Sequence, residues 1–390
     1  MMTSRERMMA ALEHRRPDRV PYDLAGTHVS GIHRVAYENL CRYLGETSEP
    51  IRFADVIQQV VTPSEAMLDR LRVDTRGLYP RTSHNWNVRG VAKDGFLEYI
   101  DEWGFVHHFP EGGYWWSLVK SPLDAMEVTP EQIRNHPWPV ASLPERFAGL
   151  RDQAKAFRAA GKIVILKGLC AGLLEMGQRL RGMENFLCDV MTDPAGATVV
   201  IDQFVRLKMQ FWDMALEKLG DVVDIVVESD DYGTQESQLI PPDTFRSLFK
   251  PRYREIFALI QKKFKEKKPA GERGWIFFHS CGNVRPILPD LIEIGVDILN
   301  PVHVHAAGMD PVALKRDFGS AVTFWGGGVE TQQVLPRGTP VEVREDVKRN
   351  LEALMPGGGY VFNTVHNIQA EAPPENIVAM WEALQEFGKY

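Results

Sequence analysis

Short apolar runs alternate with longer amphipathic segments along most of this chain. We expect eight of these runs to be β-strands, because they are rich in β-branched and aromatic residues. They are Arg19–Leu24, Asp74–Tyr79, Lys162–Lys167, Asp224–Glu228, Trp275–His279, Asp297–Asn300, Ala321–Trp325 and Gly359–Asn363. Nearly continuous apolar runs of this length are typical of parallel strands that are buried on both faces.

The segments between the strands carry helix start signals. Pro311 opens one amphipathic segment, Pro340 opens another, and Pro242 precedes a third. Proline is favoured in the first turn of a helix, so the second half of the chain reads as a series of βα units. Eight such units predict a (β/α)8 barrel, an α/β fold in which residues 1–390 form one domain.

One segment departs from this pattern. Val88–Leu118 is aromatic and contains glycine-rich turns, which predicts β-hairpins inserted after the second barrel strand, within an insertion of approximately residues 81–144. The insertion is expected to cover part of the barrel mouth. Its aromatic residues either line a pocket there or form a small separate core. The candidates for both roles are Trp103, Tyr114, Trp115 and Trp116.

Composition and charge exclude several classes of protein. The net charge is −7 and there is no long basic run, so we expect no nucleic-acid partner. The four cysteines form no CxxC pair, which argues against a disulfide scaffold. We find neither a signal-peptide apolar region nor a run of about 20 apolar residues, and therefore expect a cytoplasmic protein that does not enter a membrane.

Polar residues gather where the predicted strands end. In a barrel of parallel strands the carboxyl ends share one rim, and active sites are built on that rim. The residues concerned are Glu228, Asp230 and Asp231 after the fourth strand, His279 and Cys281 after the fifth, Asn300, His303 and His305 after the sixth, Trp325 after the seventh, and Asn363 and His366 after the eighth.

The pair His279 and Cys281 is the most specific chemical signal. An imidazole and a thiolate two residues apart at a strand end suit Zn²⁺, which binds nitrogen and sulfur ligands tetrahedrally. The alternative is a buried cysteine beside a hydrogen-bonded histidine. Three protein ligands would leave one position open for water or substrate. Candidates for the third ligand, in order of preference, are His366, Glu228, and then His303 or His305.

The three acidic residues after the fourth strand have two readings. They either cap a turn and the following helix, or bind substrate and transfer protons, since clustered carboxylates raise one another's pKa. We predict catalytic roles for Glu228 and Asp231. The residues predicted to contact substrate are Asp230, Asn300, Trp325 and Asn363.

Several longer stretches share a family resemblance. They are RRPDRVPYDLAG, DDYGTQESQLIPPDTFRSLFKPRYREIF, FHSCGNVRPILPDLIEIGVDILNPV, FWGGGVETQQVLPRGTP and GGYVFNTVHNIQAEAPPENI. Together they resemble the uroporphyrinogen decarboxylase-like (URO-D) superfamily over essentially the whole chain. The resemblance implies one of two activities: cofactor-free decarboxylation of uroporphyrinogen, or zinc-dependent methyl transfer between a corrinoid protein and a thiol or similar acceptor.

The two branches differ in their motifs. Decarboxylases carry an arginine-rich RQAGRY motif after the first strand, whereas this chain has Leu24–Val29 there, without arginine. The methyltransferase branch carries HxC, which is present as His279 and Cys281, and a last cysteine, which is missing. His366 stands in that region and is the expected substitute ligand.

The resemblance therefore favours a zinc methyltransferase that acts on a small methoxylated or methylated substrate. The corrinoid would be carried on a separate protein, because no DxHxxG cobalamin motif occurs here. A homodimer is also expected from the resemblance. Two alternatives stay open. One is a cofactor-free decarboxylase, for which Arg52, Arg76 and Arg81 are the candidate carboxylate-binding residues, and the other is a non-enzymatic ligand-binding barrel.

Overall fold

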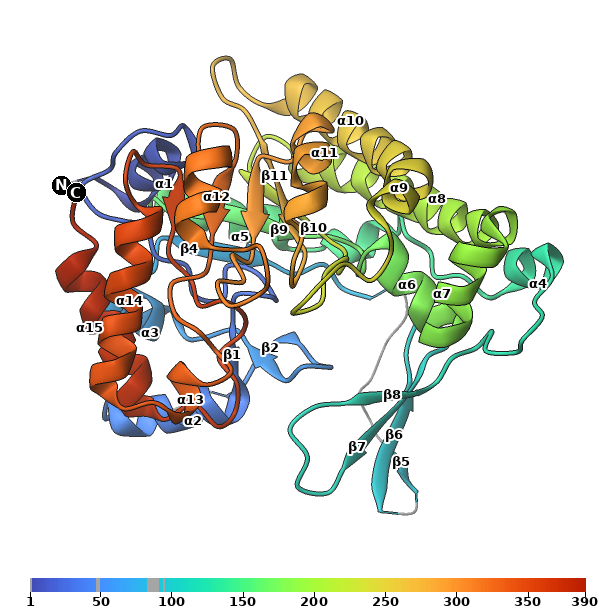
Figure 1. Ribbon diagram of the computed structural model, residues 1–390, viewed down its shortest axis with the longest axis horizontal. Coiled ribbons are helices and arrows are strands. Elements are labelled where there is room, and N and C mark those ends of the chain that lie inside the picture. The colour runs from blue at the N-terminus through green and yellow to red at the C-terminus, as the bar shows by residue number, and fades with distance from the viewer. Residues whose placement is uncertain (1, 47–49, 83–90, 94) are drawn as a thin grey trace.

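A computed structural model describes residues 2–46, 50–82, 91–93 and 95–390 of the chain (Figure 1). The first part of the predicted insertion, residues 83–90, lies outside the described residues.

Seven parallel strands form one curved sheet in the order β14-β13-β12-β11-β10-β9-β4. Their bounds are β4 Thr75–Leu78, β9 Ile163–Lys167, β10 Ile225–Ser229, β11 Trp275–His279, β12 Ile298–Asn300, β13 Thr323–Trp325 and β14 Tyr360–Val361. Each coincides with a predicted strand to within about two residues at each end, the usual uncertainty of strand limits.

The remaining predicted strand, Arg19–Leu24, fills the gap between β14 and β4. Tyr22 forms a parallel bridge with Phe362, and the amide of Phe362 donates to the carbonyl of Pro21 at 2.8 Å. On the other side, the amide of Asp74 donates to the carbonyl of Tyr22 at 2.9 Å. This segment closes the sheet, which confirms the predicted (β/α)8 barrel.

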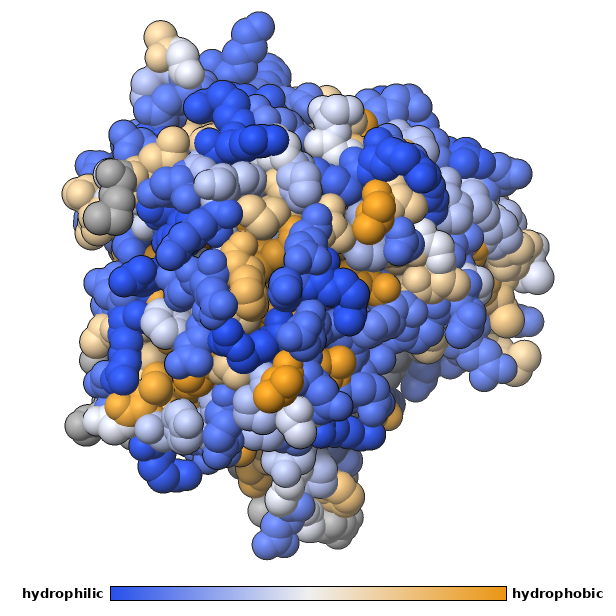
Figure 2. Space-filling view, turned by 60° about the vertical axis from the view of Figure 1, so that its left-hand side comes forward, coloured by the Kyte–Doolittle hydropathy of each residue, from blue (hydrophilic) through white to orange (hydrophobic). Residues whose placement is uncertain are grey.

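Helices surround the sheet in Figure 1, and α12 and α14 begin at the predicted prolines. The helices are α1 Ser4–Leu12, α2 Arg34–Tyr43, α3 Glu65–Arg70, α4 Pro130–Asn135, α5 Leu150–Ala159, α6 Leu173–Arg181, α7 Met183–Thr192, α8 Pro194–Leu219, α9 Pro242–Thr244, α10 Lys250–Lys267, α11 Leu288–Glu293, α12 Pro311–Phe318, α13 Val334–Arg337, α14 Pro340–Leu354 and α15 Pro374–Phe387. The face shown in Figure 2 is mainly hydrophilic with small, scattered apolar areas. Across the residues that the structure describes, no helix combines the length and apolarity needed to cross a bilayer.

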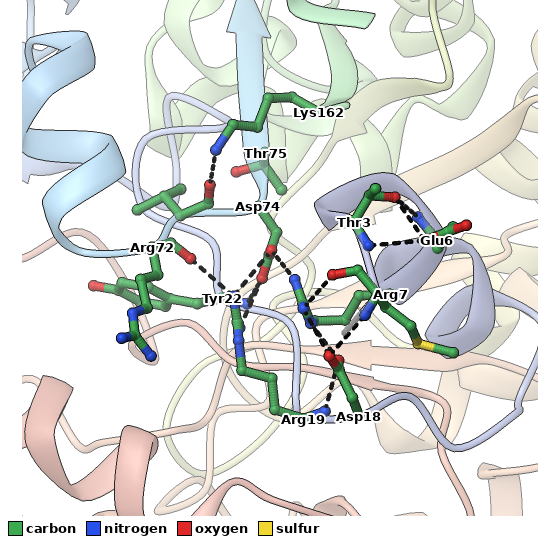
Figure 3. Close-up of polar contacts among 12 residues, drawn as sticks. Thr3, Glu6, Arg7, Asp18, Arg19, Tyr22, Arg72, Asp74, Thr75 and Lys162 are labelled. Atoms are coloured by element: carbon green, nitrogen blue, oxygen red, sulfur yellow. Dashed lines mark hydrogen bonds and ion pairs between the residues drawn. The ribbon is translucent and has the colours of Figure 1, made fainter. Parts of the chain in front are cut away.

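A buried charge cluster holds the closing segment at its amino-terminal end (Figure 3). The fully buried carboxylate of Asp74 accepts hydrogen bonds from the Tyr22 amide at 2.9 Å, from Arg7 at 2.8 Å and from Arg19 at 2.9 Å. Arg7 is in turn paired with Asp18 at 2.7 Å. Side-chain contacts thus fix a segment that has few ladder hydrogen bonds of its own.

Two antiparallel sheets accompany the barrel. The small sheet, which was not predicted, contains β1 Ile32–His33, β3 Val60–Val61 and β2 Phe53–Asp55. The larger sheet contains β5 Val91–Lys93, β6 Phe96–Ile100, β7 Val106–Pro110 and β8 Ser117–Lys120. It lies between β4 and β9 in the chain and projects from the barrel (Figure 1), which confirms the predicted insertion after the second barrel strand.

The aromatic residues of the insertion divide between the two predicted roles. Trp103 lines the large cavity at the barrel mouth. Trp116 is buried in a small separate core, with its ring 4.5 Å from that of Tyr99. Tyr114 and Trp115 are 46% and 48% exposed and belong to neither.

The register of the strands decides which side chains face the barrel interior. Successive side chains on a strand point to opposite faces. Ile225 and Val227 pack in the interior core, whereas Val226 packs in the core shared with the helices. Ser229 therefore points inward at the end of β10, and Glu228 and Asp230 point outward to the helices.

Candidate metal centre and active site

Three side chains predicted as metal ligands meet at the mouth of the barrel. His279 ends β11, Cys281 follows it by two residues, and His366 follows β14. One ligand atom from each lies within 4.8 Å of the other two. The Sγ atom of Cys281 is 3.4 Å from Nε2 of His279, and the rings of the two histidines are 5.6 Å apart.

The donor set fits a zinc ion. Zn–N bonds near 2.1 Å and Zn–S bonds near 2.3 Å give donor–donor distances of about 3.3–3.6 Å in a tetrahedral site. The Sγ–Nε2 distance of 3.4 Å between Cys281 and His279 already has this length. Two imidazoles and one thiol are also donors that zinc prefers.

A hydrogen-bond chain orients the His279 ring. Its Nδ1 atom lies 2.6 Å from Oδ1 of Asn300, while Nδ2 of Asn300 donates to the carbonyl of Trp325 at 2.8 Å. Because the Asn300 amide must present its oxygen to His279, Nδ1 carries the proton and donates. The lone pair of Nε2 is then free to bind a cation beside Cys281.

Burial sets the protonation of the other two ligands. It lowers the pKa of His366 to about 4, so this imidazole is neutral at pH 7. Burial, reinforced by the nearby carboxylates of Asp231 and Glu175, raises the pKa of the Cys281 thiol well above its ordinary value. Binding a cation reverses this preference, since a metal favours the thiolate.

A cavity of about 990 Å³ opens beside these residues. Its walls include strand ends of the barrel and the connection between β6 and β7 of the insertion. Side chains that lie on its walls include His28, Trp103, Lys167, Asp231, His279 and His366. The size and position are those of a small-molecule site at the carboxyl-terminal face of a barrel.

The cavity walls carry more negative than positive side chains. The carboxylates are Asp55, Asp101, Glu102, Glu145, Glu175 and Asp231, and the cations are Arg81, Lys167 and Arg179. Two of the three cations already have anionic partners: Lys167 lies 3.4 Å from Asp55, and Arg179 pairs with Glu175. This lining disfavours a substrate with many carboxylates.

The structure does not bring Glu228 to the mouth. Its Oε2 atom accepts from the ammonium of Lys208 at 2.6 Å, and Oε1 accepts from the indole of Trp212 at 2.6 Å. Both partners are on α8, and the Lys208 and Glu228 side chains are fully buried. Glu228 thus links the sheet to a helix, because the alternation of β10 turns it away from the cavity.

Asp230 also faces the helices. Its carboxylate accepts from the amides of Leu174 at 2.9 Å and Glu175 at 3.0 Å, at the start of α6, and from the hydroxyl of Tyr253 at 2.9 Å. Asp230 therefore caps a helix, which is the first of the two roles expected for the acidic residues after the fourth strand. Asp231, by contrast, lines the cavity, accepts from the Cys281 amide at 2.8 Å and lies 3.8 Å from Nε2 of His279.

Three residues predicted to contact substrate are buried away from the cavity walls. Asn300 holds His279, as described above. Trp325 is in the interior core of the barrel and donates from Nε1 to Asp23 at 2.9 Å. Asn363 donates to the carbonyl of Asp23 at 3.1 Å. Of the weaker ligand candidates, His303 accepts from the Gly282 amide at 3.0 Å.

Lys167 and His28 were not predicted as site residues, yet both line the cavity. Lys167 is the charged last residue of an otherwise apolar strand, two positions after the inward-facing Ile165. This spacing of two residues could have predicted that the Lys167 side chain faces the barrel interior. His28 lies in the loop after the closing segment, and only the fold brings this loop beside the other strand ends.

Comparison with known proteins identifies the family of this chain. The model of the uroporphyrinogen decarboxylase (URO-D) family matches residues 127–387, which is more than half of the chain. No curated protein sequence matches. A solved methyltransferase from Methanosarcina mazei is similar with a TM-score of 0.62 and 16% identity over 99% of both chains, which supports the fold. A thermostable mutant of a xylanase from Cellvibrio japonicus reaches a TM-score of only 0.35 at 10% identity, covering 62% of this chain and 83% of the xylanase, and contributes nothing to the assignment. The chain belongs to the uroporphyrinogen decarboxylase (URO-D) family.

Proposed function

We propose that this protein is a zinc-dependent methyltransferase that moves a methyl group between a small substrate and a corrinoid protein or thiol. The observation that carries this proposal is the convergence of His279, Cys281 and His366 beside the cavity. These three residues would hold the ion. When bound, zinc supplies Lewis-acid activation of a thiol or of the atom that carries the methyl group.

The residues of the chain have distinct parts in this proposal. Asn300 keeps the Nε2 lone pair of His279 directed at the centre. Trp103 provides an apolar surface against which the body of a small substrate can pack. Asp231 lies 3.8 Å from Nε2 of His279 and is placed to take up a proton there. Glu228 and Asp230 have no part, because their oxygens are bound by helix residues.

The decarboxylase alternative receives less support from the cavity. Recognition of many carboxylates needs unpaired arginines, which bind them in a bidentate manner. Of the three candidates, Arg76 is buried and paired with Glu65 at 2.8 Å and Asp69 at 3.0 Å. Among the described residues, only Arg81 of these candidates lines the cavity.

The proposal is tested first by metal content. Purified protein should contain about one zinc ion per chain by elemental analysis, and His279→Ala and Cys281→Ala should lose it. Cys188→Ala is the matched control because this cysteine is exposed on α7 and is not among the clustered ligand residues. A wild-type protein that binds no metal after reconstitution would overturn the proposal.

Activity is tested with methylcobalamin and a simple thiol. Methyl transfer to the thiol changes the visible absorption of the corrinoid, and the rate should fall at least about 100-fold in Cys281→Ala. Uroporphyrinogen is assayed in parallel. Turnover of uroporphyrinogen without methyl transfer would establish the decarboxylase alternative instead.

A further inference from the structure

We propose that Asp231 is the fourth donor of the metal centre in the resting enzyme and that the incoming substrate displaces it. This inference rests on the proposed function and gives Asp231 a role beyond proton transfer. It names the residue that closes the centre when no substrate is present.

The position of the Asp231 carboxylate is the first argument. Its Oδ1 atom accepts a hydrogen bond from the Cys281 amide at 2.8 Å and lies 3.8 Å from Nε2 of His279. A tetrahedral centre needs an oxygen–nitrogen distance of about 3.3–3.4 Å. The carboxylate must therefore move at least about half an ångström toward the centre to bind an ion there, since it lies outside the group of ligand atoms that are within 4.8 Å of one another.

Charge is the second argument. Two neutral imidazoles and one thiolate offset only one of the two charges of Zn²⁺, which leaves a net positive charge among buried ligands. A nearby carboxylate makes the centre neutral. Across the described part of the chain, no lysine or arginine forms an ion pair with Asp231, and its only charge partner is His279. Two other carboxylates of the cavity walls differ, since Asp55 is paired with Lys167 and Glu175 with Arg179.

Exposure explains why this donor can leave. The Asp231 side chain is 40% exposed and lines the cavity, whereas the His279 side chain is only 5% exposed. A carboxylate is also a weaker donor to zinc than a thiolate. A substrate thiol that enters from the cavity can take its place, losing its S–H proton to the freed carboxylate, which then stays bound to the Cys281 amide.

The experiment uses Co²⁺ in place of zinc, because its visible spectrum reports the number and kind of donors. Apo wild type, Asp231→Asn and Asp231→Glu are titrated with Co²⁺ and then with 2-mercaptoethanol. Asp243→Asn is the matched control, since that side chain is 93% exposed. Thermal melting of each apo protein by circular dichroism establishes folding.

Asp231→Asn is expected to change the affinity for Co²⁺ and the affinity for the thiol in opposite directions. Asp231→Asn should bind Co²⁺ at least about 10-fold more weakly, with an altered spectrum, because a donor is lost. At a pH at which the thiol is already ionised and needs no base, it should nevertheless bind the thiolate more tightly than wild type does, because no carboxylate competes for the position. Asp231→Glu should recover part of the Co²⁺ affinity, and Asp243→Asn should match wild type.

Two outcomes would overturn the inference. One is an Asp231→Asn protein whose Co²⁺ affinity and spectrum equal those of wild type. The other is weaker binding of the ionised thiol by that variant, which would mean that Asp231 holds the substrate rather than competing with it. A wild-type protein that takes up no Co²⁺ would overturn the proposed function as well, so the two failures are distinguishable.

Discussion

Nδ1 of His279 lies 2.6 Å from Oδ1 of Asn300, and this contact decides which nitrogen of the histidine can bind a cation. Asn300 is itself fixed by its bond to the Trp325 carbonyl at 2.8 Å. The fold places Asn300 on the next strand, β12, in register with His279. A ligand and its orienting residue are thus positioned by two paired strands rather than by a loop.

Removing this contact should weaken metal binding without removing a ligand. Asn300→Ala is expected to lower zinc affinity by about 10- to 100-fold, the usual effect of losing the partner of a metal-bound histidine. Competition with a chromogenic chelator measures the affinity. Asn135→Ala, at an exposed position, is the control. Unchanged zinc affinity in Asn300→Ala would show that Asn300 does not orient the ligand.

Glu228 should matter for stability and not for metal binding. Glu228→Gln leaves the buried ammonium of Lys208 without its anion, which is expected to cost about 3–5 kcal/mol in the free energy of unfolding. Urea denaturation measures this loss. The double variant Glu228→Gln/Lys208→Met should recover part of it. Loss of zinc from a folded Glu228→Gln protein would instead point to a role at the centre.

Asp74 should contribute strongly to barrel closure. Asp74→Asn removes the charge that is shared by Arg7 and Arg19, and we expect a loss of about 3 kcal/mol in the free energy of unfolding. Asp69→Asn is the control because that side chain is 63% exposed, and it should cost less than about 1 kcal/mol. Equal losses in both variants would contradict the closing role of Asp74.

The buried ammonium of Lys315 should make the free energy of unfolding depend on pH. Burial lowers the pKa of its ammonium from 10.5 to about 8, and the amine donates to the Gly358 carbonyl. Between these two values the unfolded chain binds more protons at this site than the folded protein, so the contribution of Lys315 to stability increases as the pH rises from about 8 to about 10.5.

The comparison with Lys315→Met isolates this contribution from other titrating groups. The free energy of unfolding of Lys315→Met should exceed that of wild type by most at pH 7, where folded wild type carries the cost of a buried charge. Its advantage should shrink by pH 10. Urea denaturation of both proteins at pH 7, 8, 9 and 10 checks the trend, and a difference that is constant with pH would refute it.

Most of the barrel follows from local sequence patterns. The strands β9, β10 and β11 are continuous apolar runs, which a parallel sheet buried on both faces requires. The closing segment Arg19–Leu24 was also visible as a short apolar run. The strands β1 and β3 were not predicted, because two-residue strands carry no periodic signal and depend on long-range pairing.

The site was less predictable because a strand end presents residues to both faces. The run from Ile225 to Asp230 alternates, so knowing that Val227 faces inward would have placed Glu228 against the helices. The proximity of His366 to His279 followed from the shared rim of a barrel. The role of Asn300 as the partner of His279 required the register of β11 and β12, which no single sequence reveals.

The closing contact between Asp23 and Asn363 joins positions that are 340 residues apart. During synthesis the Arg19–Leu24 segment therefore emerges long before the strand that completes its neighbourhood. Until then the growing sheet has an unpaired edge, which is a surface prone to aggregation. Contacts of such large sequence separation also form slowly, so we expect assembly of this ring to finish only when the last βα unit has left the ribosome.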